Sequence, residues 1–461
     1  MVENQYNVQR VDPIGLFVLL LTMLLILSRK RAYVYMGIAI VIAFLPGSQR
    51  IVIGSLDFPF IRIAVIVGFI RCVIYQEAKI RAWALPDTLV LVWVLWSSAT
   101  QFLVYGRIDA SITRFGFAID AAGMYFLARF LVRSRQDVID LFKMASIVAI
   151  CSAPFFLIES QTGRNIFSQL GGVPEYSLVR NGRLRCQGPF SHPIMAGLFW
   201  AMWLPSVVSM AVALKRDRIL WILGCTAILI IVYATASSTP VMAVILGIGT
   251  LMLYPGRKWL SVAVWCGLFA AAGLHLVMAK GVHHVLARIN IVSGSTGWHR
   301  YYLMDEAINH FGEWFLIGTK STAHWGLGLS DVTNQFVLEA TKGGLIGMVV
   351  FTAILILVMR ANGSASIHSQ DRAVSLINWG FFAGLIAMTF SFIGVSLFGA
   401  AISGYFLFQG TAMSYAQLST VPDRRKVRAR GQVQRTGRDE AALRGRRIKG
   451  IGGVRSARRP T

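Results

Sequence analysis

Long apolar stretches, separated by short polar connections, run through most of the chain. Thirteen of them are long enough, or nearly long enough, to cross a bilayer, which takes roughly 17–25 mostly apolar residues per helix. They lie at residues 13–28, 32–46, 59–76, 85–105, 112–132, 138–158, 192–214, 219–236, 239–255, 259–279, 333–359, 374–396 and 398–418. The last two are separated only around Ser396. The pattern therefore predicts an all-α, polytopic membrane helical bundle with about 12–13 transmembrane helices.

The composition agrees with this pattern and excludes other classes of protein. Of the 461 residues, 55% are hydrophobic and only 14% are charged, whereas a soluble domain has about 25% charged residues. The 28 Phe, 12 Trp and 13 Tyr must be buried, which excludes disorder for most of the length. A net charge of +24 suggests nucleic acid in a soluble protein. Here the basic residues lie between long apolar runs, so we expect membrane lipids and no nucleic acid as partners.

Clusters of Lys and Arg follow every odd-numbered apolar run. Because cytoplasmic loops of membrane proteins carry an excess of these residues, the alternation predicts that these loops and the C-terminal tail are cytoplasmic, and that the N-terminus is outside. The clusters contain Arg29, Lys30 and Arg31; Lys79 and Arg81; Arg133 and Arg135; Lys215, Arg216 and Arg218; Arg257 and Lys258; and Arg360 and Arg372.

The chain is expected to have two parts, a membrane domain at residues 1–420 and a basic tail at residues 421–461. The tail is rich in Arg and Gly and almost free of aromatic residues, so it is predicted to be disordered. Attraction to the anionic inner leaflet, about 1 kcal/mol per basic residue near the surface, is the simplest role for it. Binding of a nucleic acid or an acidic partner is the weaker alternative.

Two polar segments on the outer side, residues 159–191 and 280–332, are long enough to form a functional site on a rigid scaffold. Most histidines of the chain gather there. Six of the eight lie in these segments or at their edges, namely His192, His283, His284, His299, His310 and His324. These two larger extracytoplasmic loops are therefore the candidate site.

The first segment ends in three arginines, Arg180, Arg183 and Arg185, followed by a turn and a helix that is predicted to begin near His192. Guanidinium groups match phosphate oxygens in a bidentate way, and free N–H groups at a helix N-terminus add positive potential. This pattern is typical of an anion site. A solvated basic loop or a contact with lipid headgroups is the alternative, and His192 either orients a phosphate or caps its helix.

The second segment contains Arg300, and a helical stretch with Glu306, His310 and Glu313 is predicted to follow it. The last three are spaced i, i+4 and i+7, so they would share one helical face that could bind a divalent metal. Such faces are commonly only solvated. The chain also has no Asp-x-Asp pair, and we therefore expect no metal and no other cofactor.

Asp331 and Asn334 follow His324 and precede a long apolar run. If helical, they lie one turn apart, at the outer mouth of that span. They are candidates for contact with substrate, and the alternative is a simple helix cap, since Asp and Asn are favoured there.

These motifs together resemble the O-antigen ligase and O-antigen polymerase family. The sequence Arg-Cys-Gln-Gly-Pro-Phe-Ser-His-Pro at residues 185–193 is similar to its Arg-x-x-Gly…Pro segment. Arg300, with the helix and the Gly318 loop after it, resembles the second arginine of the family. Residues 333–347 resemble its third element, which is usually His-Asn ahead of a Gly-x-x-Gly span. The likeness covers roughly residues 185–350; elsewhere it rests on topology alone.

The chain departs from the family pattern at two places. The usual histidine falls at Thr333, so that either Asp331 or His324 takes over its role, or the activity is altered or lost. The family also often has Ser-Arg after an apolar run near the middle, whereas Ser237 and Ser238 are followed here by Thr239.

The resemblance implies a metal-independent glycosyltransferase in the bacterial inner (cytoplasmic) membrane, working at its extracytoplasmic face. Its donor would be an oligosaccharide on a polyprenyl diphosphate, and its acceptor a glycan or lipid-glycan. Such a polymerase or ligase serves O-antigen, lipopolysaccharide or exopolysaccharide biosynthesis in the cell envelope, with other polysaccharide assembly proteins as further partners.

Each candidate residue has an expected role in this reaction. Arg185 and Arg300 would stabilise the charge that develops on the diphosphate leaving group. The general base would be Asp331 or, as second choice, His324. Contact with the substrate is expected from Arg180, Arg183, His192 and Asn334.

A secondary transporter or lipid-linked saccharide flippase is the rival interpretation. Charges near the bilayer midplane cost roughly 2.5–3.5 kcal/mol each by insertion scales, so they are usually functional. Asp120, in the middle of the fifth apolar run with Arg114 and Arg129 flanking it, is the best such residue. A structural assembly partner without catalysis is a third interpretation, favoured in part by Thr333.

Overall fold

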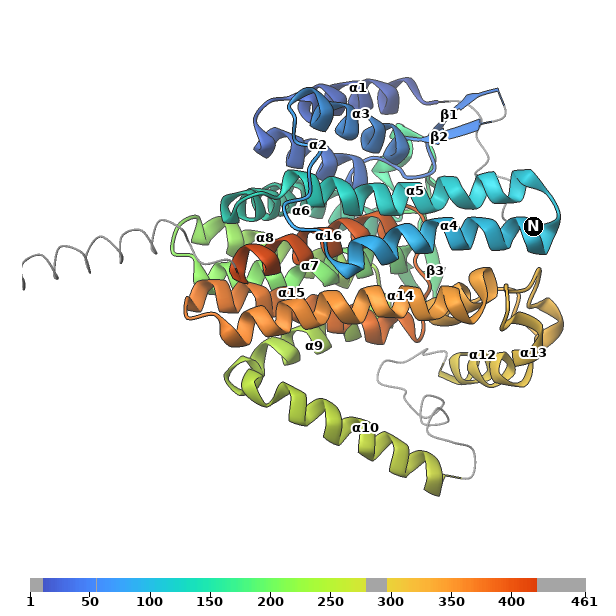
Figure 1. Ribbon diagram of the computed structural model, residues 1–461. Helices are drawn as coiled ribbons and strands as arrows, with labels where there is room; N and C mark the ends of the chain where they lie inside the picture. Colours follow the sequence, from blue (N-terminus) through green and yellow to red (C-terminus); the bar gives the residue numbers. More distant parts are fainter. Residues whose placement is uncertain (1–10, 55, 279–296, 421–461) are drawn as a thin grey trace, which may run out of the picture. The chain divides into compact units, whose positions relative to one another are not determined.

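The computed structural model describes residues 11–54, 56–278 and 297–420, and it is built almost entirely of helices (Figure 1). They are α1 (Pro13–Leu27), α2 (Arg31–Ala43), α3 (Phe60–Ile74), α4 (Leu85–Tyr105), α5 (Ile108–Leu131), α6 (Arg135–Thr162), α7 (Pro193–Ala213), α8 (Arg218–Ala234), α9 (Ser238–Met252), α10 (Leu260–Val277), α12 (Gly297–Asn309), α13 (Phe311–Trp314), α14 (Gln335–His368), α15 (Arg372–Phe392) and α16 (Ala400–Thr420).

Short elements complete the described part of the chain. Three 3-10 helices are present, η2 (Ile166–Leu170), η3 (Tyr254–Trp259) and η5 (Ala323–Trp325). Two antiparallel hairpins pair β1 (Arg50–Ile53) with β2 (Leu56–Pro59), and β3 (Leu178–Arg180) with β4 (Arg183–Arg185).

Each of the thirteen apolar runs corresponds to one helix, which confirms the all-α polytopic bundle. Six helices in the described residues are long and apolar enough to cross a membrane, namely Leu85–Tyr105, Arg135–Thr162, Pro193–Ala213, Tyr254–Val277, Gln335–His368 and Arg372–Phe392. Four more are apolar but shorter, with 10–17 residues. The chain is thus a multi-pass membrane protein, while the count of 12–13 spans stays a prediction. The expected disordered tail, at residues 421–461, lies outside the described residues.

Side-chain caps define where several of these helices begin. Asp12 accepts hydrogen bonds from the first free N–H groups of α1, and Pro13 follows it at the first helical position, where its fixed φ suits the helix. Ser134 and Asp137 form a reciprocal capping box at the start of α6. Asp371 caps α15 in the same way as Asp12 caps α1. Local sequence therefore places the ends of the helices.

Helices α7 and α15 are both largely buried in the bundle, and they pack directly on each other. Glycine permits this close approach, since a Cβ at Gly384 of α15 would lie 2.6 Å from the carbonyl oxygen of Met202 on α7. Large aromatic side chains, including Trp200, Trp203 and Phe381, fill the surrounding core. This packing fixes the N-terminus of α7 beside the C-terminus of α15.

The two long polar segments meet at one end of the bundle, which we call the long-loop end. It comprises residues 159–193, 234–239, 297–335 and 392–400, where α6, α8 and α15 end and α7, α9, α14 and α16 begin. Hydrogen bonds between these residues, such as that from Cys186 N to Ala234 O at 3.1 Å, hold them together. The basic clusters at residues 133–135, 215–218, 257–258 and 360–372 lie at or near the opposite ends of these helices.

Helix α14 is broken near its start. Gly343 and Gly344 have non-helical backbone angles, and Gly344 has a φ of 64°. The chain after α13 fills the break: Leu345 N donates to Phe315 O at 2.8 Å, and Thr319 N donates to Thr341 O at 2.9 Å. A Cβ at Gly344 would overlap the carbonyl oxygen of Leu316, so only glycine fits. The second polar segment is thereby attached to α14.

Several charges between neighbouring helices of the bundle are paired. Arg129 of α5 donates to both carboxylate oxygens of Asp87 on α4, at 2.8 and 2.9 Å, and the hydroxyl of Tyr125 donates to the same carboxylate at 2.8 Å. Asp120 pairs with Arg62 of α3, at 2.8 and 2.9 Å, and not with the flanking Arg114 or Arg129. These ion pairs join neighbouring helices.

The Asp87–Arg129 pair yields a test of bundle stability. Replacement Asp87→Asn should lower the free energy of unfolding by about 3–5 kcal/mol, because it leaves a buried guanidinium without its counter-ion. Thermal unfolding of the purified protein in detergent, followed by circular dichroism, measures the change. Asp109→Asn is the matched control, since the Arg107–Asp109 pair is largely exposed and should contribute little. Equal midpoints for the two variants would contradict this expectation.

Candidate functional site

Two arginines from distant parts of the sequence converge on one short turn at the long-loop end. Arg185, at the end of β4, donates through Nη2 to Ser237 Oγ at 2.7 Å. Arg300, on α12, donates through Nη2 to Thr239 Oγ1 at 3.0 Å. Ser237 is the N-cap residue of α9 and Thr239 lies in its first turn. Both guanidinium groups therefore lie beside the start of this helix, where the helix dipole is positive.

The loop after Arg185 is held by buried backbone hydrogen bonds. The carboxylate of Glu159, at the end of α6, accepts from Gln187 N and Gly188 N at 3.0 Å each, and from the hydroxyl of Ser177 at 2.8 Å. Gly188 has a φ of 54°, and a Cβ there would meet the ring of Phe156 at 2.5 Å. The position of Arg185 is thus fixed by the end of α6 as well as by α8.

Arg300 lies against the connection between α15 and α16. A Cβ at Gly394 would overlap its Nε, so a larger residue there would displace the guanidinium. Asn334 caps α14 through Oδ1 and donates through Nδ2 to Ile393 O at 3.1 Å. The next residue, Gln335, accepts from Leu397 N at 2.7 Å. The start of α14 therefore holds the connection that packs on Arg300.

Neither guanidinium has a counter-ion among the described residues, since none of their carboxylates lies within 4 Å of Arg185 or Arg300. The Nε atoms of both are buried and have no hydrogen-bond partner there. Arg185 is only 7% exposed. A buried positive charge with unused N–H donors is costly unless an anion compensates it. The electrostatics of the two arginines therefore favour the binding of an anion.

Burial also shifts the acid–base equilibria at this site. It lowers the pKa of Arg185 below its ordinary value, and the charge of Arg180 adds to the effect. Burial likewise lowers the pKa of Arg300. In both cases the positive form loses hydration that a bound anion would replace.

His192 is the N-cap residue of α7, and its Nδ1 accepts from Ile194 N at 3.2 Å. Its ring lies edge-on to Phe398, with centroids 6.4 Å apart. Burial, with a smaller contribution from the charge of Arg185, lowers the pKa of His192 to about 4. Of the two predicted roles, capping is the one that the contacts display.

The remaining predicted residues lie farther out or apart. Arg180 and Arg183 are exposed and face each other in the β3–β4 hairpin. Asp331 is also exposed. Its carboxylate forms no hydrogen bond or ion pair with another described residue. His324 is paired with Glu313, at 2.7 Å between Nε2 and Oε2. The structure thus brings together Arg185, Arg300, His192 and Asn334, and it shows no contact of either predicted base with the two arginines.

The predicted metal-binding face differs from the structure in one respect. Glu306 and His310 do interact, with His310 Nδ1 2.9 Å from Glu306 O. However, α12 ends at Asn309, and Glu313 belongs to the separate helix α13. The three residues therefore do not share one continuous helical face.

Three residues of the site were not predicted as such. Ser237 and Thr239 accept hydrogen bonds from the two arginines, and Gly394 makes room for one of them. The run Ser-Ser-Thr at residues 237–239 stands between two apolar runs on the outer side. That position was the available signal, since hydroxyl groups there can bind guanidinium groups. Gly394 had no comparable signal.

Comparison of the sequence with protein-family models and with curated proteins finds no match.

The depressed pKa of His192 predicts a loss of stability in acid. Its folded-state pKa, about 4, lies below the unfolded value near 6.5. Neutral His192 therefore makes its full contribution to the free energy of unfolding above pH 6.5. This contribution is lost as the pH falls toward 4, by up to roughly 2 kcal/mol at pH 5. His192→Asn keeps a capping side chain and should flatten this dependence. Unfolding midpoints at pH 7 and pH 5, compared between the two proteins, measure it; parallel losses would exclude His192 as the cause.

Proposed function

We propose that the protein is a membrane glycosyltransferase that joins polyprenyl-diphosphate-linked saccharide units to a glycan acceptor at the extracytoplasmic face. It would act as an O-antigen or exopolysaccharide polymerase or ligase. The observation that carries the proposal is the pair Arg185 and Arg300 on the turn at Ser237 and Thr239, without a carboxylate partner in the described residues. The same two arginines carry the resemblance to the O-antigen ligase and polymerase family.

The chemistry requires a site of this kind. In the reaction, the bond between the sugar anomeric carbon and the diphosphate oxygen breaks, and a bond from that carbon to an acceptor oxygen forms. The acceptor hydroxyl loses its proton to a base, and the lipid diphosphate leaves with increased negative charge. Donors fixed beside that oxygen stabilise the transition state more than the ground state. Two guanidinium groups and the N-terminus of α9 supply such donors.

The location of the arginines suits a lipid-linked donor. They lie at the long-loop end, where membrane helices meet polar segments, so that a diphosphate could bind there while its polyprenyl chain stays in the bilayer. The basic clusters lie at the opposite ends of the helices, as the positive-inside rule expects of cytoplasmic loops. Arg31 at that end is held by Glu77 at 2.8 Å and by Asp137 at 3.2 Å. These features support an inner-membrane protein with its active site outside and its tail in the cytoplasm.

The general base remains a choice between two residues. Asp331 is exposed and has an accessible carboxylate, whereas His324 is engaged by Glu313. Thr333, at the position where the family usually has histidine, has a buried hydroxyl without a partner in the described residues. We therefore keep Asp331 as first choice, acting once the acceptor is bound.

The transport alternative rested on Asp120 as a membrane charge that needs a function. Its carboxylate is instead neutralised by both Nε and Nη2 of Arg62. This pair explains Asp120 as a link between α3 and α5, so Asp120 no longer argues for transport.

Replacing the arginines tests the proposal. Arg300→Lys and Arg185→Lys should each lower the rate of glycosidic bond formation by about 10²–10³-fold, the usual cost of losing one such donor, because lysine cannot form the bidentate fork. The assay uses purified lipid-linked oligosaccharide and protein in liposomes, with and without an acceptor lipid core. Arg135→Lys, exposed at the opposite end, is the matched control. Unchanged yield and product length in both site variants would refute the proposal.

The base assignment has its own test. Asp331→Asn should abolish transfer while membrane insertion and donor binding persist, since the amide cannot accept the acceptor's proton. His324→Gln should keep most of the rate. Single-turnover rates with the same lipid-linked donor compare the two variants, and the reverse ranking would assign the base to His324.

A further inference from the structure

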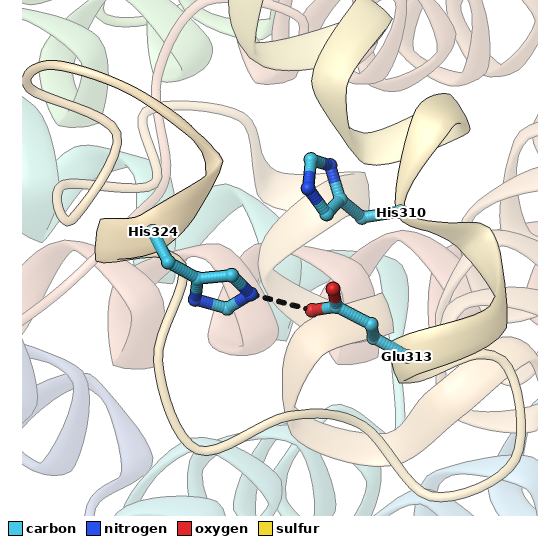
Figure 2. A group of neighbouring side chains, drawn as sticks. All are labelled: His310, Glu313 and His324. Atoms are coloured by element: carbon cyan, nitrogen blue, oxygen red, sulfur yellow. Dashed lines mark hydrogen bonds and ion pairs between the residues drawn. The ribbon is translucent and has the colours of Figure 1, made fainter.

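A second group of side chains converges in the outer segment, separate from the two arginines. His310 follows the end of α12, Glu313 lies on α13, and His324 lies on η5 (Figure 2). One ligand atom from each of the three lies within 4.8 Å of the others. Figure 2 shows the two imidazole rings and the carboxylate directed toward a common space, with His324 and Glu313 joined by the 2.7 Å contact.

The spacing of these atoms suits a tetrahedral metal ion. With metal–ligand bonds of about 2.0–2.2 Å, the ligand atoms of such a site lie roughly 3.3 Å apart. Pairs between 2.7 and 4.8 Å apart reach that separation by small side-chain rotations. The three residues belong to short elements joined by turns, so no helix has to bend to allow this.

The groups behind the three residues orient them as metal sites require. His310 Nδ1 lies 2.9 Å from Glu306 O and 3.4 Å from a carboxylate oxygen of the same residue. With its proton on Nδ1, the ring presents the lone pair of Nε2. Trp325 Nε1 donates to Glu313 Oε2 at 3.0 Å, and the indole ring stacks on His310 at 5.4 Å. Trp325 is only 3% exposed, so it forms a fixed support.

We infer that His310, Glu313 and His324 bind a zinc ion, with water in the fourth position. Two imidazoles and one carboxylate are ligands typical of zinc, whereas magnesium and calcium prefer oxygen alone. The ion would join α12 and α13 to η5 and so fasten the segment that follows Arg300. This inference does not rest on the proposed function, whose chemistry uses no metal, and it departs from the expectation of no metal drawn from the sequence.

Zinc binding to the full-length protein tests the inference without any enzymatic assay. The protein is purified in detergent with an affinity tag that contains no histidine, stripped with a chelator, and titrated with zinc chloride by calorimetry. We expect one tight equivalent of zinc and a higher unfolding midpoint with zinc, because the ion binds the folded state. His310→Ala and Glu313→Gln should each weaken binding at least tenfold.

The variants separate metal binding from folding. Glu313→Gln keeps an oxygen that accepts from Trp325, so it should elute as wild type in size-exclusion chromatography while its zinc affinity falls. His368→Ala is the matched control, because His368 is exposed at the end of α14 and its hydrogen bonds go to Ser364. Absence of a tight equivalent in the wild type, or equal affinity in wild type and Glu313→Gln, would overturn the inference.

Discussion

A guanidinium group taken out of water must find a negative partner, and this requirement organises the bundle. Arg129 and Arg62 satisfy it with Asp87 and Asp120, and these pairs tie α5 to α4 and to α3. Arg185 and Arg300 meet only hydroxyl groups in the described residues, and a hydroxyl compensates a full charge poorly. The stability lost at these two positions must be supplied by the surrounding bundle, which is a pattern typical of functional sites.

The contacts that hold the two arginines in place come from residues at the ends of helices. Glu159 holds the loop that positions Arg185, and Asn334 holds the connection that packs on Arg300. Both anchors lie at helix termini, where backbone groups lack intrahelical partners and readily accept side-chain bonds. Helix α14 packs on α15, and α15 packs on α7. The arrangement of the two arginines is thus a consequence of how the helices pack and end.

Much of this arrangement could be predicted from the sequence, and the reason for the rest is physical. Apolar runs define membrane helices directly, because the bilayer demands them. Arg185 and Arg300 were recognisable as charges in polar outer segments. Gly394 was not, since a missing side chain leaves no signal until the fold brings it against an arginine. His324 comes close to His310 because the chain turns between them. The helical periodicity of a sequence cannot report contacts across a turn.

In the second polar segment, the single helix α12 connects Arg300 with the proposed zinc ligands. Arg300 lies near the start of α12, and His310 directly follows its end. Beyond it, Trp314 Nε1 donates to Ala307 O at 2.7 Å, and the chain at Phe315 is bonded to the break in α14. Arg300 itself is anchored by one hydroxyl, so the precision of its guanidinium depends on the rigidity of α12. Because catalysis by fixed donors is sensitive to displacements of about 1 Å, an ion held by His310 would act on the site by limiting the motion of this helix.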